Sequence, residues 1–172
     1  MSPGFDAAVK AVAPGQWDTQ SPCEEWKARD IVAHIVEGHR GVIASVRGGE
    51  SKPLDAEEDP SQAWEQASRA MDEIAGDPEE SAKEVDGPTG RMPAGDMIIR
   101  FVSMDVLVHT WDLARTVGAD ERLDEDSVQQ AYDALKPMDE MIRMRGVFGP
   151  KLEPPPNADL QTEFLYFLGR QA

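Results

Sequence analysis

Residues 96–117, DMIIRFVSMDVLVHTWDLARTV, decide the fold that the sequence predicts. Their apolar side chains recur at steps of three and four residues, which is the period of one buried helix face. Gly118 follows directly, as glycine commonly does after the last turn of a helix. Two carboxylates and one imidazole interrupt the apolar face, at Asp105, His109 and Asp112. The stretch therefore predicts a long helix whose buried face carries polar chemistry.

The rest of the chain has the same helical character. Proline at the start and glycine just past the end mark a helix over 60–75, and Gly48-Gly49 ends another over 27–46. Shorter helices are expected over 5–13 and 160–169, and one over 127–144 that Pro137 should kink or break. A loop or short extended piece is expected over 85–95, and a loop over 146–158. Few stretches alternate with period two, so we predict an all-α fold and one domain over residues 1–172.

Composition excludes several classes of protein. Acidic residues outnumber basic ones by 33 to 17, giving a formal net charge of −16, which nucleic acid would repel. No apolar run approaches the roughly 18 residues of a membrane helix, and the N-terminus lacks the pattern of a signal peptide. We therefore expect a cytoplasmic protein without a membrane or nucleic-acid partner. With one cysteine, an internal disulfide and a multi-cysteine metal site are excluded.

A divalent-metal site is predicted from His34, Asp105 and His109. Asp105 and His109 are one helical turn apart, so both side chains point the same way. His34 lies within the apolar stripe of the 27–46 helix, which can face them. Three protein ligands with an open fourth position are typical of catalytic zinc. The alternative, which spacing alone leaves open, is a buried polar network without metal.

Nearby residues receive secondary interpretations. Asp112 shares the stripe and is expected to orient His109 or Arg115 rather than bind metal. His39 lies about 140° around the helix from His34, so we expect it at the surface. Cys23 is interpreted as a small buried hydrophobe, with a reactive thiol as the alternative. The indoles of Trp26 and Trp111 are expected in the core or at its rim, with a substrate-facing role as the alternative.

Two segments resemble a known family. Residues 17–34 carry the pattern Trp-x-x-x-Ser-Pro-Cys-x-x-Trp-x-x-Arg-Asp-Ile-x-x-His, and residues 105–115 carry Asp-x-x-x-His-Thr-Trp-Asp-Leu-Ala-Arg. Both are similar to the N-terminal domain of mycothiol-dependent maleylpyruvate isomerases, within the DinB/YfiT-like superfamily. The tail, with Phe-Gly-Pro at 148–150 and Gly-Arg at 169–170, resembles an actinobacterial branch of that family.

The resemblance implies a four-helix bundle of the DinB/YfiT-like type with additional short helices. It also implies a metal, zinc or nickel, held by His34, Asp105 and His109, where the isomerase pattern has a glutamate in place of Asp105. The open metal position would take the sulfur of a low-molecular-weight thiol, mycothiol in actinobacteria. That thiol would then attack a small electrophile.

Three functions follow as hypotheses. The first is a metal- and mycothiol-dependent transferase or isomerase, for which Arg91, Arg100 and Arg115 are candidates to grip the charged, sugar-bearing thiol. The second is a metal-dependent hydrolase, which needs a general base and has only Asp112 as an ambiguous candidate. The third is a non-catalytic metal-binding or stress-related bundle. A homodimer is left open.

Overall fold

The structure is a computed structural model that describes residues 2–144 and 148–172. The chain divides into two compact units, Met1–Asp120 and Glu121–Ala172. The expectation of one domain over 1–172 stays a prediction. The predicted all-α fold is confirmed, since the strands of the described residues form only one short two-stranded sheet.

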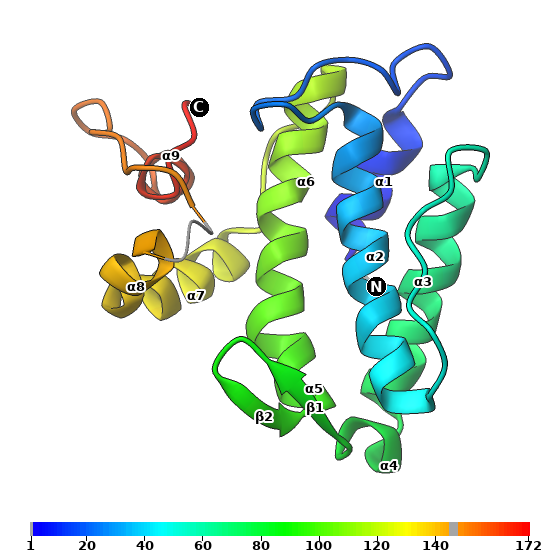
Figure 1. Ribbon diagram of the computed structural model, residues 1–172. Helices are drawn as coiled ribbons and strands as arrows, with labels where there is room; N and C mark the ends of the chain where they lie inside the picture. The colour runs from blue at the N-terminus through cyan, green and yellow to red at the C-terminus, as the bar shows by residue number, and fades with distance from the viewer. Residues whose placement is uncertain (1, 145–147) are drawn as a thin grey trace. The chain divides into compact units, whose positions relative to one another are not determined.

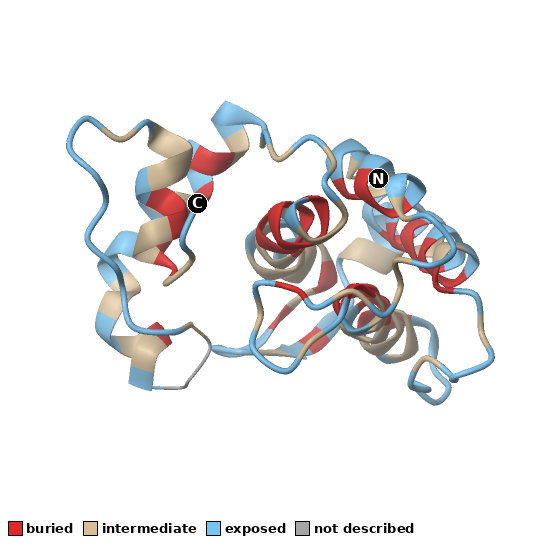
Figure 2. Cartoon of the chain, turned by 90° about the horizontal axis from the view of Figure 1, so that it is seen from above, coloured by how far each residue is buried: buried red, intermediate tan, exposed pale blue. Residues whose placement is uncertain are grey.

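Four helices pack side by side in the first unit (Figure 1): α1 (Pro3–Ala11), α2 (Ala28–Arg47), α3 (Pro60–Gly76) and α6 (Ser103–Val117). Helix α2 contacts both α3 and α6, and α1 also packs against these two. Buried residues gather on the faces that these helices turn toward one another (Figure 2). The rings of Phe5 and Trp64 pack edge to face within this core, with their centroids 4.7 Å apart.

Local signals set the helix ends close to the predicted positions. The Asp59 carboxylate accepts from the N–H groups of Ser61 and Gln62, at 2.8 and 3.2 Å, and so caps the start of α3. Asp30 accepts from the backbone N–H of Lys27 at 2.8 Å at the start of α2. Helix α6 ends at Gly118, whose φ of 72° is left-handed and suits glycine.

The stretch expected as a loop or short extended piece is a hairpin. It follows the short helix α4 (Pro78–Ser81) and pairs β1 (Glu84–Gly87) with β2 (Gly90–Pro93) in antiparallel register. Val85 lies opposite Met92 and both are buried, Val85 in one cluster with Val42 and Val46 from the end of α2. The hairpin therefore closes one end of the helical core.

The long helix predicted over 96–117 is not one regular α-helix. Helix α5 (Ala94–Met97) leads into a π-helical segment, η1 (Ile98–Val102), before α6 begins. The N–H and the Oγ–H of Ser103 both donate to the carbonyl of Ile98, the hydroxyl at 2.9 Å. Such π segments add one residue to a helix and are frequent beside functional sites.

The second unit consists of short helices. They are α7 (Glu125–Leu135), the 3-10 segment η2 (Lys136–Met138), α8 (Asp139–Met144) and α9 (Leu160–Phe167). The predicted break at Pro137 is confirmed by η2. Residues 148–158 contain no helix or strand, as expected, and residues 146 and 147 lie outside the described part. The Arg143 guanidinium donates to the carbonyl of Phe167 at 2.6 Å.

None of the helices in the described part of the chain combines the length and apolar character needed to cross a bilayer.

Candidate metal centre

His34 on α2 and the pair Asp105 and His109 on α6 come together, as their spacing predicted. His34 Nε2 lies 3.0 Å from Asp105 Oδ2, and His109 Nε2 lies 3.5 Å from Asp105 Oδ1. One ligand atom from each of the three residues falls within 4.8 Å of the other two. Zinc bonds of about 2.0–2.2 Å to N and O at tetrahedral angles place such donors about 3.4 Å apart, close to these distances.

The three side chains differ in exposure. His34 and Asp105 are 41% and 46% exposed, whereas His109 is 9% exposed. The cluster therefore has a buried side at His109 and a side open to solvent at His34 and Asp105. A ligand can reach the open side without unfolding of the core.

Electrostatics couples His34 to Asp105. Their hydrogen bond raises the pKa of His34 above its ordinary value, against the opposing effect of burial. Burial alone would raise the pKa of Asp105, but the hydrogen bond from His34 and the nearby imidazoles outweigh it, and the pKa is lowered. Asp105 is thus held as a carboxylate, the form that binds a cation.

Asp112 lies behind His109, on the side of the ring away from Asp105. Its side chain is fully buried, and Oδ2 lies 2.9 Å from His109 Nδ1. The two atoms are near each other, although Nδ1 does not meet the carboxylate in hydrogen-bond alignment. A carboxylate at this nitrogen favours a proton there and leaves Nε2 free to bind a metal, an arrangement common around metal-bound histidines.

The turn before α2 brings two more residues to the cluster. The centroid of the Trp26 ring lies 4.9 Å from that of the His34 ring. Trp26 also stacks on the His109 ring, with the two centroids 5.5 Å apart. The Cys23 thiol donates to Asp112 Oδ2 at 3.4 Å. Trp26 is half-buried at the cluster, whereas Trp111 is buried in the core as expected. The sequence signal for both turn residues was the Pro-Cys-x-x-Trp pattern alone.

The prediction that His39 lies at the surface is wrong. Its side chain is buried, with the ring edge to face against Trp64 at 5.4 Å and Nδ1 bonded to the carbonyl of Ile35 at 2.8 Å. Because α2 packs against α3 as well as α6, it buries two faces, and the face opposite His34 is one of them. Burial lowers the pKa of His39 to about 4.

The three arginines proposed for thiol binding lie on separate elements. Arg91 on β2 donates to the Glu84 carbonyl at 3.3 Å, across the hairpin. Arg100 in η1 lies over the Phe101 ring, and Arg115 in the last turn of α6 lies over the Trp111 ring. All three are exposed, and their role toward a thiol stays a prediction.

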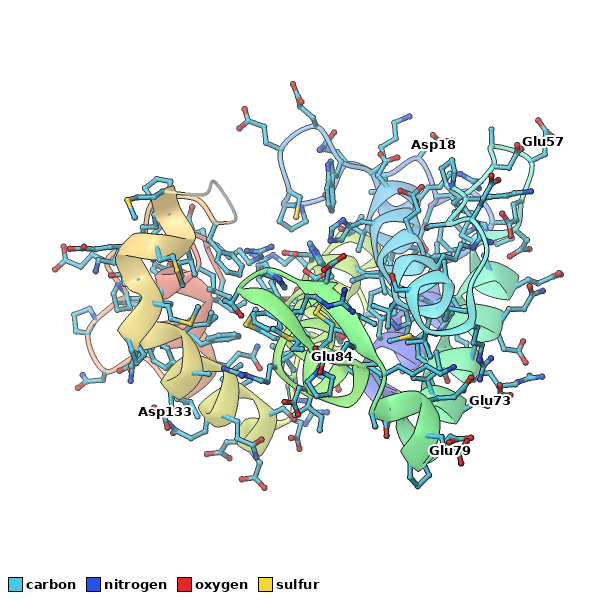
Figure 3. All side chains as sticks on the ribbon, turned by 60° about the horizontal axis from the view of Figure 1, so that its bottom comes forward. Asp18, Glu57, Glu73, Glu79, Glu84 and Asp133 are labelled. Atoms are coloured by element: carbon cyan, nitrogen blue, oxygen red, sulfur yellow. The ribbon has the colours of Figure 1, made fainter. Side chains whose placement is uncertain are left out.

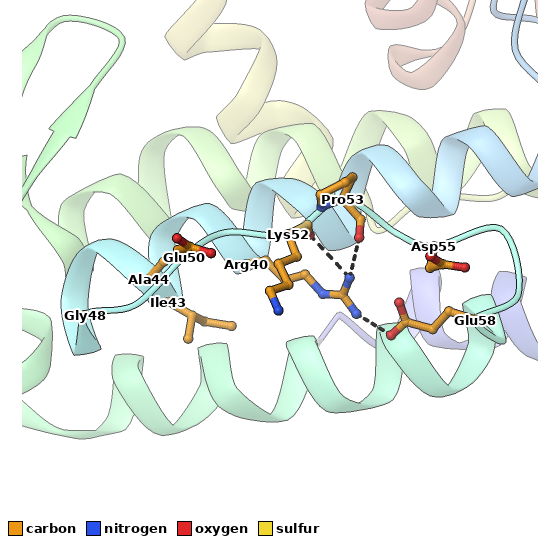
Figure 4. Close-up of a pocket in the computed structure, with 9 residues that line it drawn as sticks. All are labelled: Arg40, Ile43, Ala44, Gly48, Glu50, Lys52, Pro53, Asp55 and Glu58. Atoms are coloured by element: carbon orange, nitrogen blue, oxygen red, sulfur yellow. Dashed lines mark hydrogen bonds and ion pairs between the residues drawn. The ribbon is translucent and has the colours of Figure 1, made fainter.

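A surface pocket of about 580 Å³ lies elsewhere in the first unit, between α2 and residues 48–58 (Figure 4). Arg40 crosses it, donating to the carbonyls of Lys52 and Pro53 and to the Glu58 carboxylate. No residue of the His34, Asp105 and His109 cluster lines it. Arg40 already bonds three groups, and these bonds tie the connection between α2 and α3 to the helices.

Comparison with known protein families gives a match that lies within the first unit. The family described as the mycothiol maleylpyruvate isomerase N-terminal domain matches residues 3–114. The chain belongs to this family. The match contains α1, α2, α3 and most of α6, and with them every residue of the metal cluster.

Two curated relatives of this chain are uncharacterized proteins of Mycobacterium tuberculosis, from strains CDC 1551 / Oshkosh and ATCC 25618 / H37Rv. Each is 30% identical over 133 residues, which cover 77% of this chain and 71% of the relative. No solved structure matches the chain.

Proposed function

We propose that the protein is a divalent-metal-dependent enzyme that transfers a low-molecular-weight thiol to a small electrophile, or isomerises it through that thiol. The observation that carries this proposal is the convergence of His34, Asp105 and His109 within 4.8 Å, in a family named for a mycothiol-dependent isomerase domain. Zinc is the metal that we propose first and nickel second, because two imidazoles and one carboxylate suit both.

The residues fit a metal better than a plain polar network. His109 Nε2 lies 3.5 Å from Asp105 Oδ1, which is longer than an ordinary N–H···O hydrogen bond but close to the spacing of about 3.4 Å between two donors around zinc. A cation between the two atoms would therefore suit this spacing better than a direct hydrogen bond does. A bound divalent cation would act as a Lewis acid and lower the pKa of a coordinated thiol.

The side chains of the cluster divide the remaining work. The Asp112 carboxylate lies behind His109, near Nδ1, and would help to orient the ring, while Trp26 covers both imidazoles from the side of the 20–27 turn. The open side, at His34 and Asp105, is where a thiol and an electrophile would enter. Arg91, Arg100 and Arg115 remain the candidates to bind the charged parts of the thiol.

The geometry favours thiol transfer over hydrolysis. A hydrolase needs a general base that can reach the attacking water. Asp112 was the candidate, but its side chain is fully buried and faces Nδ1, behind the imidazole. It is therefore placed to position His109 and not to accept a proton at the open side.

Metal content tests the first step. Elemental analysis of the protein supplied with zinc or nickel should give about one equivalent of metal. In a Cys23→Ser background, which removes the only thiol of the chain, His34→Gln and Asp105→Asn should lose the metal while helical circular dichroism persists. Asp18→Asn, a carboxylate exposed at 85%, is the matched control and should keep the metal. A wild type that stays free of metal under these conditions would overturn the proposal.

A cobalt-substituted Cys23→Ser variant tests the second step. Removing the only cysteine ensures that any thiolate-to-cobalt absorption comes from the added thiol. Mycothiol should produce such a band and Asp105→Asn should abolish it. No band, with cobalt bound, would leave a metal-binding bundle without thiol chemistry.

We also propose a cytoplasmic location, where low-molecular-weight thiols are kept reduced.

A further inference from the structure

Cys23, His109 and Asp112 form a second cluster of metal-ligating atoms beside the first. Cys23 Sγ lies 3.4 Å from Asp112 Oδ2, and the same oxygen lies 2.9 Å from His109 Nδ1. The sulfur, nitrogen and oxygen all fall within 4.8 Å of one another. Around a zinc ion, sulfur–oxygen and nitrogen–oxygen pairs are about 3.4–3.6 Å apart, so these two contacts need shifts of only a few tenths of an ångström.

Burial makes this cluster unlike an exposed group of acids. The Asp112 side chain has no exposure and that of His109 has 9%. His109 Nδ1 is buried and lies 2.9 Å from Asp112 Oδ2 without an aligned hydrogen bond. A buried ring nitrogen in that state lacks a properly placed partner, and a cation between the three atoms would supply one.

The turn that carries Cys23 is held in place by its own hydrogen bonds. The Gln20 side-chain amide donates to the carbonyls of Ser21, Cys23 and Trp26, at 3.3, 3.3 and 2.8 Å. Ser21 Oγ accepts from the Cys23 N–H at 3.1 Å. Cys23 is only half-buried, so an ion can reach the thiol from solvent. The sulfur is thus positioned before any ion arrives.

We propose that Cys23, His109 and Asp112 bind a thiophilic divalent cation of the zinc and cadmium type, at a site separate from that of His34 and Asp105. A thiolate in the ligand set selects softer ions than two imidazoles and a carboxylate do. Binding expels the thiol proton to solvent and forms the sulfur–metal bond. The proposal goes beyond the proposed function and does not depend on thiol transfer.

The two sites exclude each other through His109. A neutral imidazole has one nitrogen with a proton and one with a free lone pair. An ion at Nε2 leaves the proton on Nδ1, facing Asp112, whereas an ion at Nδ1 leaves the proton on Nε2, facing Asp105. A thiophilic ion at the second site therefore displaces the ion of the first.

Cadmium titration of the metal-free 172-residue chain tests this site. Thiolate-to-cadmium absorption in the ultraviolet should rise to one equivalent and be absent in Cys23→Ser, the chain having no other cysteine. Asp112→Asn should weaken cadmium binding at least tenfold, whereas Asp105→Asn should keep the band. Equal cadmium affinity in Asp112→Asn and the wild type would show a thiol acting alone and overturn the proposal.

Two further readouts separate this site from the first. Cys23→Ser should retain zinc, because the first site does not use the thiol. If the first site does not exist, Cys23→Ser binds no zinc, whereas the wild type still shows the cadmium band. With zinc and cadmium both in excess, total bound metal should stay near one equivalent. Two equivalents bound together would contradict the sharing of His109.

Discussion

His39 shows how strongly burial controls a single ionisable residue in this protein. Its pKa falls from an ordinary 6.5 to about 4 because the neutral ring is buried, while the carboxylates of Asp105 and Asp72 oppose the shift more weakly. Between these values the unfolded chain binds more protons than the folded one. The stability due to His39 is therefore complete above pH 6.5 and is lost as the pH falls toward 4.

We expect the metal-free wild type to lose about 2 kcal/mol of unfolding free energy through His39 between about pH 7.5 and about pH 5. Urea unfolding in the presence of a chelator measures this loss. His39→Gln should show a smaller loss. His34→Gln is the contrasting variant, because the pKa of His34 is raised and its removal should not reduce the loss. The same pH dependence in His39→Gln and the wild type would contradict this account.

Asp112 acts on the first metal site through His109. Asp112→Asn keeps the size of the side chain but removes the charge near Nδ1, so we expect metal affinity at the first site to fall by about 10- to 100-fold. Competition with a chromophoric chelator measures it, in a Cys23→Ser background that silences the second cluster. Thermal unfolding checks that the variant is folded. Unchanged affinity would mean that the 2.9 Å contact has no part in metal binding.

At the scale of elements, the helix that carries Asp105 and His109 contains an added residue in η1. No residue of Ile98–Val102 is buried, and Ile99 is 73% exposed. Deleting Ile99 should convert the π segment to a regular helix while leaving the hairpin and α6 in place. We expect this variant to fold and to bind about one equivalent of zinc, by circular dichroism and elemental analysis.

Deletion of Leu107 is the matched control for the deletion of Ile99. It lies between Asp105 and His109, so its loss rotates one ligand by about 100° relative to the other. Metal binding should then be lost. If both deletions abolish folding, the fold requires the residue at Ile99. That result would contradict the view that η1 contains an added residue that can be removed.

The elements also show what the sequence could predict and what it could not. Helical period and capping residues placed the main helices within a few residues, and the one-turn spacing of Asp105 and His109 placed two cluster residues on one face. The second buried face of α2 depends on its packing against α3, which no local pattern encodes. The approach of Cys23 to Asp112 likewise joins residues 89 positions apart.

At the scale of the whole molecule, charge is the dominant feature. Acidic residues in different parts of the chain, such as Asp18, Glu73, Glu84 and Asp133, are exposed (Figure 3). Some carboxylates are paired, as Glu80 is with Arg47 at 2.7 Å, but exposed ion pairs contribute little to stability. With 33 acidic and 17 basic residues, the formal charge of −16 leaves about half of the negative charge uncompensated. Its repulsion favours expanded states of the chain.

Screening of this repulsion should stabilise the protein. The Debye length falls from about 30 Å at 0.01 M salt to about 4 Å at 0.5 M, so we expect the Tm of the metal-free protein to rise by several degrees over this range. Differential scanning calorimetry measures it. Choline chloride should act like sodium chloride, because the effect is screening and not binding of a particular cation. A Tm that falls with salt would show instead that attractive pairs such as Arg47 with Glu80 outweigh the net repulsion.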